Sequence, residues 1–313
     1  MHYACPKCHE PCEHDSQFCV VCGTKQPFRP RGSCEGRLLG NRYEVGHFVG
    51  KGGMGEVYKG RDLFSDQSVA VKVLLPEFKA NRDLVSRFSW EGESLFNVHH
   101  PNIVKFRAFW QDEEGDPFLI MEFLSGEPLS ALVERQQRLP AQLCVDVARP
   151  VLDGLHHLHT LPRPLVHRDV KDDNIWLLPN RQVKLMDMGI AKEVTGKRKT
   201  QAGRQIGTPE YMSPEQCRGD PQLTPASDQY SMGITLFAMA CGSVPFPRKT
   251  DGAFEVYDGH VKYSPPPPRT WCPDIPPFLE AAILRSLAKD PAQRFDSCFR
   301  MRRFLETGGR EGW

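Results

Sequence analysis

Two kinds of apolar pattern follow one another along the chain. The first part contains three short runs rich in strand-forming residues, at 43–49, 50–59 and 68–74. Residues 83–98 instead repeat Leu84, Phe88 and Leu95 at the spacing of one helical face. The pattern therefore predicts a group of strands followed by a helix.

Two longer apolar runs predict buried elements. Residues 118–124 read FLIMEFL, which is typical of a buried strand, and residues 232–241 form the densest apolar run of the chain. The second run is about half of the roughly 18 residues that a membrane-spanning helix requires. We therefore expect a buried helix there and no membrane span.

The composition is that of an ordinary folded protein. Of 313 residues, 40% are hydrophobic and 25% are charged, which is enough apolar material for a core. The 40 Lys and Arg balance 39 Asp and Glu, so no overall field favours nucleic acid or an acidic membrane. The first residues, MHYACPKCHEPC, lack the apolar core of a secretory signal. We therefore expect a cytoplasmic protein with reduced thiols.

Cysteines are concentrated at the amino terminus, in two Cys-x-x-Cys knuckles that supply four thiolates, the tetrahedral shell that Zn²⁺ prefers. A segment this short cannot bury a core, so metal binding must supply its folding free energy. We predict a zinc module over 1–24 and a linker over 25–42. The predicted ligands of the structural Zn²⁺ are Cys5, Cys8, Cys19 and Cys22. Cys12, His9 and His14 are rival ligands, and a redox dithiol or an unmetallated tail are the alternatives to zinc.

The cysteine segment resembles the zinc ribbons found at the ends of many bacterial and archaeal proteins. Since protein ligands would fill all four positions, the zinc would be structural rather than catalytic. Ribbons of this kind hold protein partners or nucleic acid about as often as they have no known role. The charges of the segment are mixed rather than arranged in a basic stripe, so a protein partner is favoured over a nucleic acid.

Glycines are concentrated in the second strand-rich run. Gly50, Gly52, Gly53 and Gly55 precede Val57, and a strand continues where a dinucleotide-binding fold would open a helix. Glycine leaves backbone N–H groups open to a phosphate. The pattern predicts a hairpin turn that covers the phosphates of a nucleotide.

A lysine interrupts the apolar strand that follows this turn. Lys72 stands in Val-Ala-Val-Lys, and a buried ammonium without a partner is costly. Glu91 falls on the apolar face of the predicted 83–98 helix, whereas Glu93 falls on the opposite face. We predict a Lys72–Glu91 pair that holds the ammonium toward the phosphates. The alternative is that Lys72 merely extends its ammonium from the apolar face to water and that Glu91 is a surface charge.

The second half of the chain contains a longer motif, His167-Arg-Asp-Val-Lys-Asp-Asp-Asn174, followed by Asp187-Met-Gly. Together with the glycine turn and Lys72, these residues resemble those of protein kinases. The resemblance covers residues 43–305. Segments such as GKGGMGEVYKG and GTPEYMSPEQ are similar to the bacterial branch of kinases that resembles eukaryotic serine/threonine kinases.

The resemblance implies phosphoryl transfer from ATP to protein Ser or Thr, with Mg²⁺ or Mn²⁺ as the metal. It implies that Asp169 accepts the hydroxyl proton, that Lys171 contacts the γ-phosphate, and that Asn174 and Asp187 hold Mg²⁺. Lys171, two positions after Asp169, is in the arrangement of serine/threonine kinases.

The resemblance also implies an ATP-binding set. Met121 would close the back of the adenine pocket, the backbone of 122–124 would bind adenine, and Trp176 would lie beneath it. The whole implied set is Gly50, Gly52, Gly53, Gly55, Val57, Ala70, Lys72, Met121, Glu122, Leu124 and Trp176.

Other matching residues have structural roles in the family. Thr208 would orient Asp169 and Lys171, Asp228 would brace the backbone of the catalytic loop, and Glu215 would pair with Arg294.

A basic segment precedes Thr208 and contains two threonines. Arg168 is the phosphate receptor that the resemblance implies, so we expect autophosphorylation at Thr200, and after it Thr195, to order this segment. The alternative is a solvated basic loop that docks acidic substrates.

The predicted fold is α+β and bilobal, like that of a protein kinase, and is preceded by the zinc ribbon. The small, mainly β lobe covers about 43–124, the larger, mainly α lobe about 125–305, and 306–313 form a tail. Four residues depart from the family pattern: Met188 for Phe, Asp172 for Pro, Trp176 for Leu or Met, and Ser213 for Ala. Met188 and Trp176 support the alternative of a catalytically impaired kinase-like scaffold that recruits partners through the zinc ribbon.

Overall fold

The computed structural model divides the chain into two compact units. One comprises residues 1–80 and 107–123, and the other residues 81–106 and 124–313. The structure describes residues 2–4, 7–8, 11–13, 19, 21–22, 24, 34–52, 55–79, 81–112, 115–188, 208–248 and 253–310.

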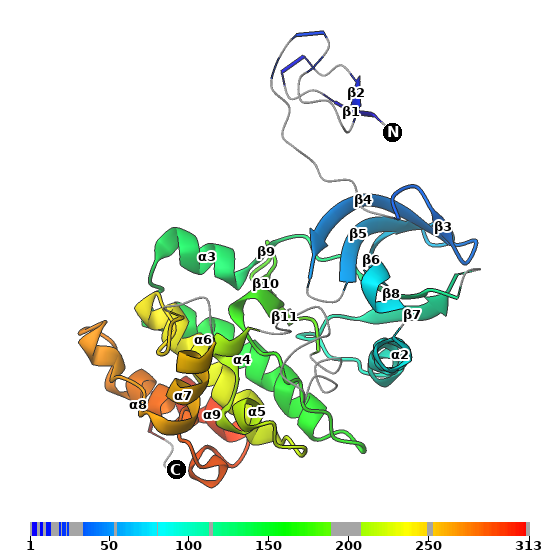
Figure 1. Cartoon of the computed structure of the whole chain (residues 1–313). Helices are drawn as coiled ribbons and strands as arrows, with labels where there is room; N and C mark the ends of the chain where they lie inside the picture. Colours follow the sequence, from blue (N-terminus) through cyan, green and yellow to red (C-terminus); the bar gives the residue numbers. More distant parts are fainter. Residues whose placement is uncertain are drawn as a thin grey trace. The chain divides into compact units, whose positions relative to one another are not determined.

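The first unit is built on a six-stranded sheet with the strand order β3-β4-β5-β6-β8-β7, and Figure 1 shows its long strands side by side. Its strands are β3 (Leu38–Leu39), β4 (Tyr43–Lys51), β5 (Gly55–Asp62), β6 (Gln67–Leu74), β7 (Phe106–Gln111) and β8 (Pro117–Glu122). A short helix, α1 (Pro76–Lys79), follows β6. Strands β4 to β6 and β8 correspond to the strands that the apolar pattern predicts.

The pairing register gives the two faces of the sheet different roles. Val57 lies opposite Lys72, Lys72 opposite Leu119, and Ala70 opposite Met121. Because side chains alternate along a strand, these residues share one face. The other face carries an apolar cluster that includes Tyr58, Val71 and Ile120. The sheet therefore separates the residues of the predicted nucleotide face from the core behind them.

The predicted linker 25–42 is ordered at its carboxyl end, where the structure differs from the prediction. Strand β3 pairs with β4, Leu39 is 2% exposed, and Cys34 is buried in the cluster behind the sheet. The sequence pattern could not predict this strand and the buried cysteine. The segment is rich in glycine, proline and arginine, and Cys34 and Leu39 are too few to form a periodic apolar pattern.

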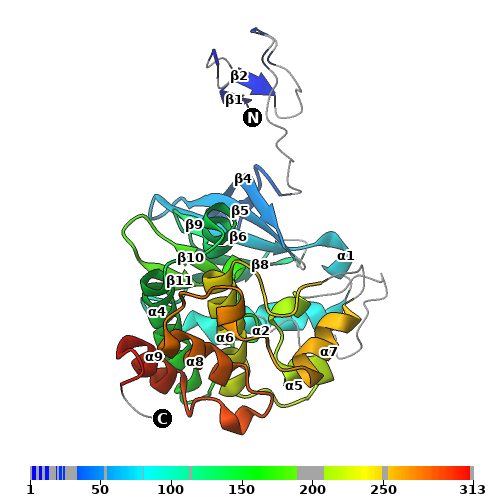
Figure 2. The ribbon, with the colours of Figure 1, turned by 90° about the vertical axis from the view of Figure 1, so that its left-hand side faces the viewer.

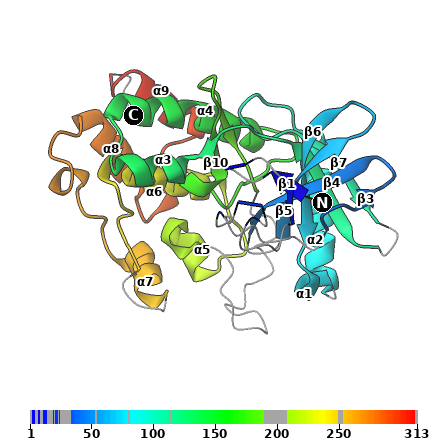
Figure 3. The same cartoon turned by 90° about the horizontal axis from the view of Figure 1, so that it is seen from above.

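The second unit is mainly helical. Its helices are α2 (Arg82–Phe96), α3 (Leu129–Gln136), α4 (Ala141–His159), α5 (Pro214–Arg218), α6 (Pro225–Cys241), α7 (Phe254–Lys262), α8 (Pro277–Ser286) and α9 (Cys298–Glu306). Figures 2 and 3 show α9 alongside α4. The second unit also contains a small sheet of order β11-β10-β9. Its strands are β9 (Glu127–Pro128), β10 (Ile175–Leu177) and β11 (Val183–Leu185).

Helix α2 belongs to the second unit, whereas the prediction placed it in the small lobe. The segment after the helix explains the difference. The Val104 amide donates to Leu185 O at 2.9 Å, and the Leu185 amide donates to Asn102 O at 2.8 Å. These backbone bonds, between residues about 80 positions apart, attach the segment to β11 and could not be read from local periodicity.

The predicted buried helix at 232–241 is the carboxyl half of α6. Met232, Ile234, Leu236 and Phe237 are all 0% exposed, in the main apolar core of the second unit. Gly242 ends the helix with a φ of +78°, and a Cβ there would lie 2.2 Å from Gln137 O, so only glycine fits. Among the helices that the structure describes, none is both long and apolar enough to cross a membrane.

Candidate active site

The predicted catalytic loop brings four of its implied residues together within the second unit. Asn174 Nδ2 donates to the backbone oxygen of Asp169 at 2.8 Å and to its carboxylate at 3.0 Å. Lys171 Nζ donates to Thr208 Oγ1 at 2.8 Å. The 3₁₀ turn Asp172–Asn174 closes the loop and directs Asn174 back toward Asp169. The Asp169 carboxylate is therefore oriented by a neighbouring side chain.

His167 ties this loop to the segment after β11 that carries Asp187. Its Nδ1 accepts from the Asp169 amide at 3.3 Å, so the neutral ring carries its proton on Nε2, which lies 3.0 Å from Met186 O. Burial lowers the pKa of His167 and keeps the ring neutral. The sequence motif contains this histidine, but only the structure reveals its role as a link.

Asp228, in the first turn of α6, anchors the catalytic loop. Its buried carboxylate accepts the backbone amides of His167 and Arg168, both at 2.8 Å, and lies 2.7 Å from His159 Nε2. Burial acts to raise the pKa of Asp228, but the hydrogen bond and charge of His159, together with His167, lower it below its usual value. His159, at the end of α4, was missed in the sequence because a lone histidine has no motif.

Asp187 follows β11 and lies next to the catalytic loop. The Met186 amide donates to Asn174 O at 2.8 Å, which brings the two predicted Mg²⁺ ligands onto adjoining segments. Asp187 has a φ of +49° and Arg168 a φ of +69°, a backbone region that costs free energy for residues other than glycine. Such strain is concentrated at functional sites.

The chemistry of this donor set fits a magnesium ion. Mg²⁺ prefers carboxylate and amide oxygens. Because Asn174 Nδ2 is engaged by Asp169, its Oδ1 is the atom that a metal would meet, and Asp187 lies on the adjoining segment. Met188, which replaces the family's Phe, is 5% exposed, so the apolar packing position is filled.

The first unit, taken by itself, carries the predicted phosphate-covering turn. The Gly52 amide donates to Gly55 O at 2.8 Å, and Gly50 lies opposite Val57. A Cβ added to Gly50 would meet nothing within 4 Å, whereas a Cβ on Gly55 would lie 2.6 Å from Val73 O. Gly55 is thus required by the sheet, and Gly50 leaves open space, which fits a phosphate approaching the backbone.

The other implied ATP-binding residues lie in both units. Ala70, Lys72 and Met121 share one sheet face with Val57 in the first unit. Leu124 and Trp176 belong to the second unit, where Trp176 lies opposite Pro128 and Lys184 on β10.

Several predicted residues lie outside what the structure describes. These are Gly53, Cys5, Thr195, Thr200 and the side chain of Glu91. The Lys72–Glu91 pair and the phosphorylation sites therefore stay predictions.

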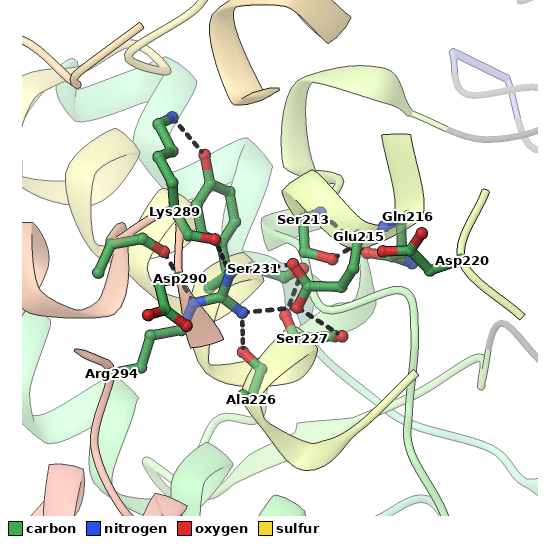
Figure 4. Close-up of polar contacts among 12 residues, drawn as sticks. Ser213, Glu215, Gln216, Asp220, Ala226, Ser227, Ser231, Lys289, Asp290 and Arg294 are labelled. Atoms are coloured by element: carbon green, nitrogen blue, oxygen red, sulfur yellow. Dashed lines mark hydrogen bonds and ion pairs between the residues drawn. The ribbon is translucent and has the colours of Figure 1, made fainter. Parts of the chain in front are cut away.

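Arg294 and Glu215 form a fully buried ion pair (Figure 4). The guanidinium donates to the two carboxylate oxygens at 2.6 and 3.0 Å and to Ala226 O at 2.7 Å. Ser227 Oγ donates to the same carboxylate at 2.9 Å. Burial acts to raise the pKa of Glu215, but the hydrogen bonds and charge of Arg294, together with the bond from Ser227, lower it below its usual value. The pair connects α5 to the segment between α8 and α9.

Ser213, which replaces the family's Ala, begins α5 as its N-cap. Ser213 Oγ accepts from the Gln216 amide at 3.3 Å, and Gln216 Oε1 accepts from the Ser213 amide at 2.9 Å. The Gln216 side chain also donates to Arg168 O at 2.8 Å. The Ser-Pro-Glu-Gln signature of this capping box was available in the sequence. It connects α5 to the catalytic loop.

Three cysteines of the amino-terminal segment also converge. The sulfur atoms of Cys8, Cys19 and Cys22 all lie within 4.8 Å of one another, and those of Cys8 and Cys19 are 3.6 Å apart. Strands β1 (His2–Ala4) and β2 (Pro11–Glu13) form an antiparallel hairpin in this segment.

Comparisons with known proteins agree with this geometry. Serine/threonine-protein kinase pkn3 of Myxococcus xanthus is 37% identical over 269 residues, which are 83% of this chain and 48% of that protein. PknA of Mycobacterium tuberculosis is 37% identical over 266 residues, which are 84% of this chain and 60% of that protein. The chain thus spans about half to three fifths of the length of these relatives.

The fold is likewise that of a solved kinase domain. The crystal structure of the Mycobacterium tuberculosis PknI kinase domain matches with a TM-score of 0.69 at 24% identity, covering 88% of this chain and 98% of that domain. The model of the protein kinase domain family matches residues 43–301. By this match, and by the catalytic loop that lies within it, the chain belongs to the protein kinase domain family.

Proposed function

We propose that this protein is a serine/threonine protein kinase that transfers the γ-phosphate of ATP to Ser or Thr hydroxyls of protein substrates. The observation that carries the proposal is the convergence of Asp169, Lys171, Asn174 and Thr208 on one anchored loop. The family uses ATP with Mg²⁺ or Mn²⁺, and bound Mg-ATP would supply the phosphoryl group and the neutralising metal charge.

Each residue of the loop has a defined task in this proposal. Asp169, held by Asn174, accepts the proton of the attacking hydroxyl. Lys171 places its ammonium against Thr208 and toward the transferred phosphoryl group. Asn174 and Asp187 provide oxygen ligands for the metal. These residues fix position and charge, and positioning with electrostatic stabilisation is nearly all the catalysis that phosphoryl transfer requires.

Transfer of labelled phosphate to a generic basic protein tests the proposal. Asp169→Asn should lower the rate at least about 100-fold, since a positioned general base is lost. Asp220→Asn is the matched control, because its carboxylate meets only the exposed Arg218 in the ion pairs described. Equal rates for the native chain and Asp169→Asn would instead support the impaired scaffold.

We further propose autophosphorylation of the basic segment before Thr208, at Thr200 and secondarily at Thr195. Arg168 supports this proposal, because Asp228 and Gln216 hold its backbone in place next to Asp169. Mass spectrometry of the active protein should find phosphate on Thr200, and Thr200→Ala should lower activity. Full activity with neither threonine modified would contradict it.

The amino-terminal cysteines are proposed to hold a structural Zn²⁺ through Cys5, Cys8, Cys19 and Cys22. Tetrahedral Zn–S bonds of about 2.3 Å place sulfur atoms about 3.8 Å apart. The 3.6 Å between the Cys8 and Cys19 sulfurs is close to that value, which supports the proposal. The zinc module would bind a protein partner, and the cytoplasmic location stays a prediction.

Metal analysis of the purified chain tests the zinc proposal. We expect a single Zn²⁺ for each chain, lost in Cys8→Ser and retained in Cys272→Ser, a cysteine of the second unit that is not a member of the cluster. Zinc retained in Cys8→Ser would show that other ligands hold the metal.

A further inference from the structure

A short segment before the kinase domain match runs behind the glycine turn. We call residues 34–37 the brace. The Gly36 amide donates to Val45 O, and the Val45 amide donates to Arg37 O, both at 2.8 Å, so the brace is bonded to β4 like an added strand. Cys34 is 5% exposed and packs in the cluster behind the sheet. This segment is therefore a fixed part of the first unit.

The brace bonds to β4 at the point where the pairing of that strand is irregular. The register between β4 and β5 shifts on both sides of Phe48. The Phe48 amide donates to Glu35 Oε1 at 2.6 Å. A bulge leaves backbone groups without ladder partners, and Glu35 supplies an acceptor for this amide. Phe48 lies two residues before Gly50, where the glycine turn begins.

The brace also reaches the strand on the other side of the turn. The Cys34 amide donates to the Tyr58 hydroxyl at 3.2 Å, and that hydroxyl donates to the Glu56 carboxylate. Tyr58 is 0% exposed, and its ring packs edge-on against Phe48. Glu56 lies opposite Lys51 across the turn, with 3.9 Å between carboxylate and ammonium. Both strands that carry the turn are thus bonded to the same segment.

We infer that Glu35 is a positioning residue for the glycine turn, and that its bond to the Phe48 amide sets the affinity for ATP from behind the sheet. Gly52, the described residue between β4 and β5, donates its amide to Gly55 O, and Gly50 has open space around it. The direction of the turn is therefore set by the strands that bear it. Glu35 holds β4 two residues before the turn, through the Phe48 amide.

The inference rests on the proposed kinase function and is tested by nucleotide binding rather than by activity alone. The probe is a non-hydrolysable ATP analogue with Mg²⁺, titrated against the full chain. Glu35→Ala should weaken binding about fivefold, the effect of one lost hydrogen bond. The KM for ATP should rise equally while kcat is unchanged.

Two further variants separate positioning from general stability. Glu35→Gln keeps an acceptor oxygen and should restore binding to within about twofold of the native value. Arg37 belongs to the brace, and Arg37→Met removes its 2.8 Å ion pair with Asp112. This variant should lower the melting temperature slightly without weakening nucleotide binding.

The outcomes are distinct. If the native chain binds the analogue and Glu35→Ala binds it with the same affinity, the inference is overturned while the proposed function stands. The inference is also overturned if Arg37→Met weakens binding as much as Glu35→Ala does, because a loss of stability would then explain both effects. If the native chain binds no nucleotide, the proposed function itself is overturned, and the inference with it.

Discussion

The catalytic loop and the glycine turn are held in opposite ways. The catalytic loop is fixed by Asp228, a distant residue of the second unit that accepts its backbone amides, and by Asn174 of the loop itself, which holds Asp169. At the glycine turn, the Gly52 amide donates to Gly55 O, and Glu35 supports β4 from behind the sheet. A proton acceptor must keep one position, whereas a cover over phosphates must let a ligand in and out.

The difference predicts how each region fails. Changes near the catalytic loop should affect both chemistry and folding, because the groups that orient Asp169 are also buried hydrogen-bonded partners. Changes in the glycine turn should affect nucleotide affinity first. Five substitutions, from the largest expected effect to the smallest, test this comparison.

Asp228→Ala should have the largest effect. It leaves two buried amides and His159 without their acceptor, so we expect a loss of at least about 3 kcal/mol of unfolding free energy. Displacement of Asp169 should lower kcat at least about 100-fold. Chemical unfolding and phosphate transfer measure the two effects. Asp228→Asn keeps one acceptor oxygen and should lose less unfolding free energy and less kcat than Asp228→Ala. A near-native kcat in either variant would show that the loop does not need this anchor.

Arg294→Met should cost about 3 to 5 kcal/mol of unfolding free energy, because Glu215 would be left charged and buried. The catalytic rate of the folded fraction should change far less than in Asp228→Ala. Urea unfolding measures the loss. The double variant Glu215→Leu/Arg294→Met should recover part of it, since both charges are removed. A single-variant loss below about 1 kcal/mol would mean that water reaches the pair.

Gly55→Ala and Gly50→Ala separate folding from binding within the glycine turn. A Cβ on Gly55 would lie 2.6 Å from Val73 O, so we expect a loss of about 1 to 3 kcal/mol of unfolding free energy. Gly50→Ala meets no protein atom within 4 Å. It should leave stability unchanged and weaken ATP binding about tenfold. Equal behaviour of the two variants would contradict the distinction between them.

Ser213→Ala should have the smallest effect. Loss of the N-cap of α5 should cost about 1 kcal/mol of unfolding free energy. Ser213→Thr retains a capping hydroxyl and is the matched control. Because Gln216 would still reach Arg168 O, kcat should fall no more than about threefold. A catalytic loss as large as that of Asp228→Ala would make α5 part of the loop's anchor.

The sequence by itself determined the chemistry of the site. The motif residues Asp169, Lys171, Asn174 and Asp187, the glycine run and the order of strands and helices are all local patterns, since their spacing along the chain reflects one turn, one strand or one helical face. The resemblance to protein kinases followed from these patterns alone, and the family match agrees with it.

Only the tertiary structure decided which groups hold those residues in place. His159 lies 69 positions from Asp228, and Glu35 lies 13 from Phe48, with no motif joining either pair. The sequence also could not predict that the segment after α2 is bonded to β11, or that Cys34 is buried. Local periodicity reports which face of an element is apolar, but the partner of a buried polar group is chosen by packing between elements that are distant in the chain.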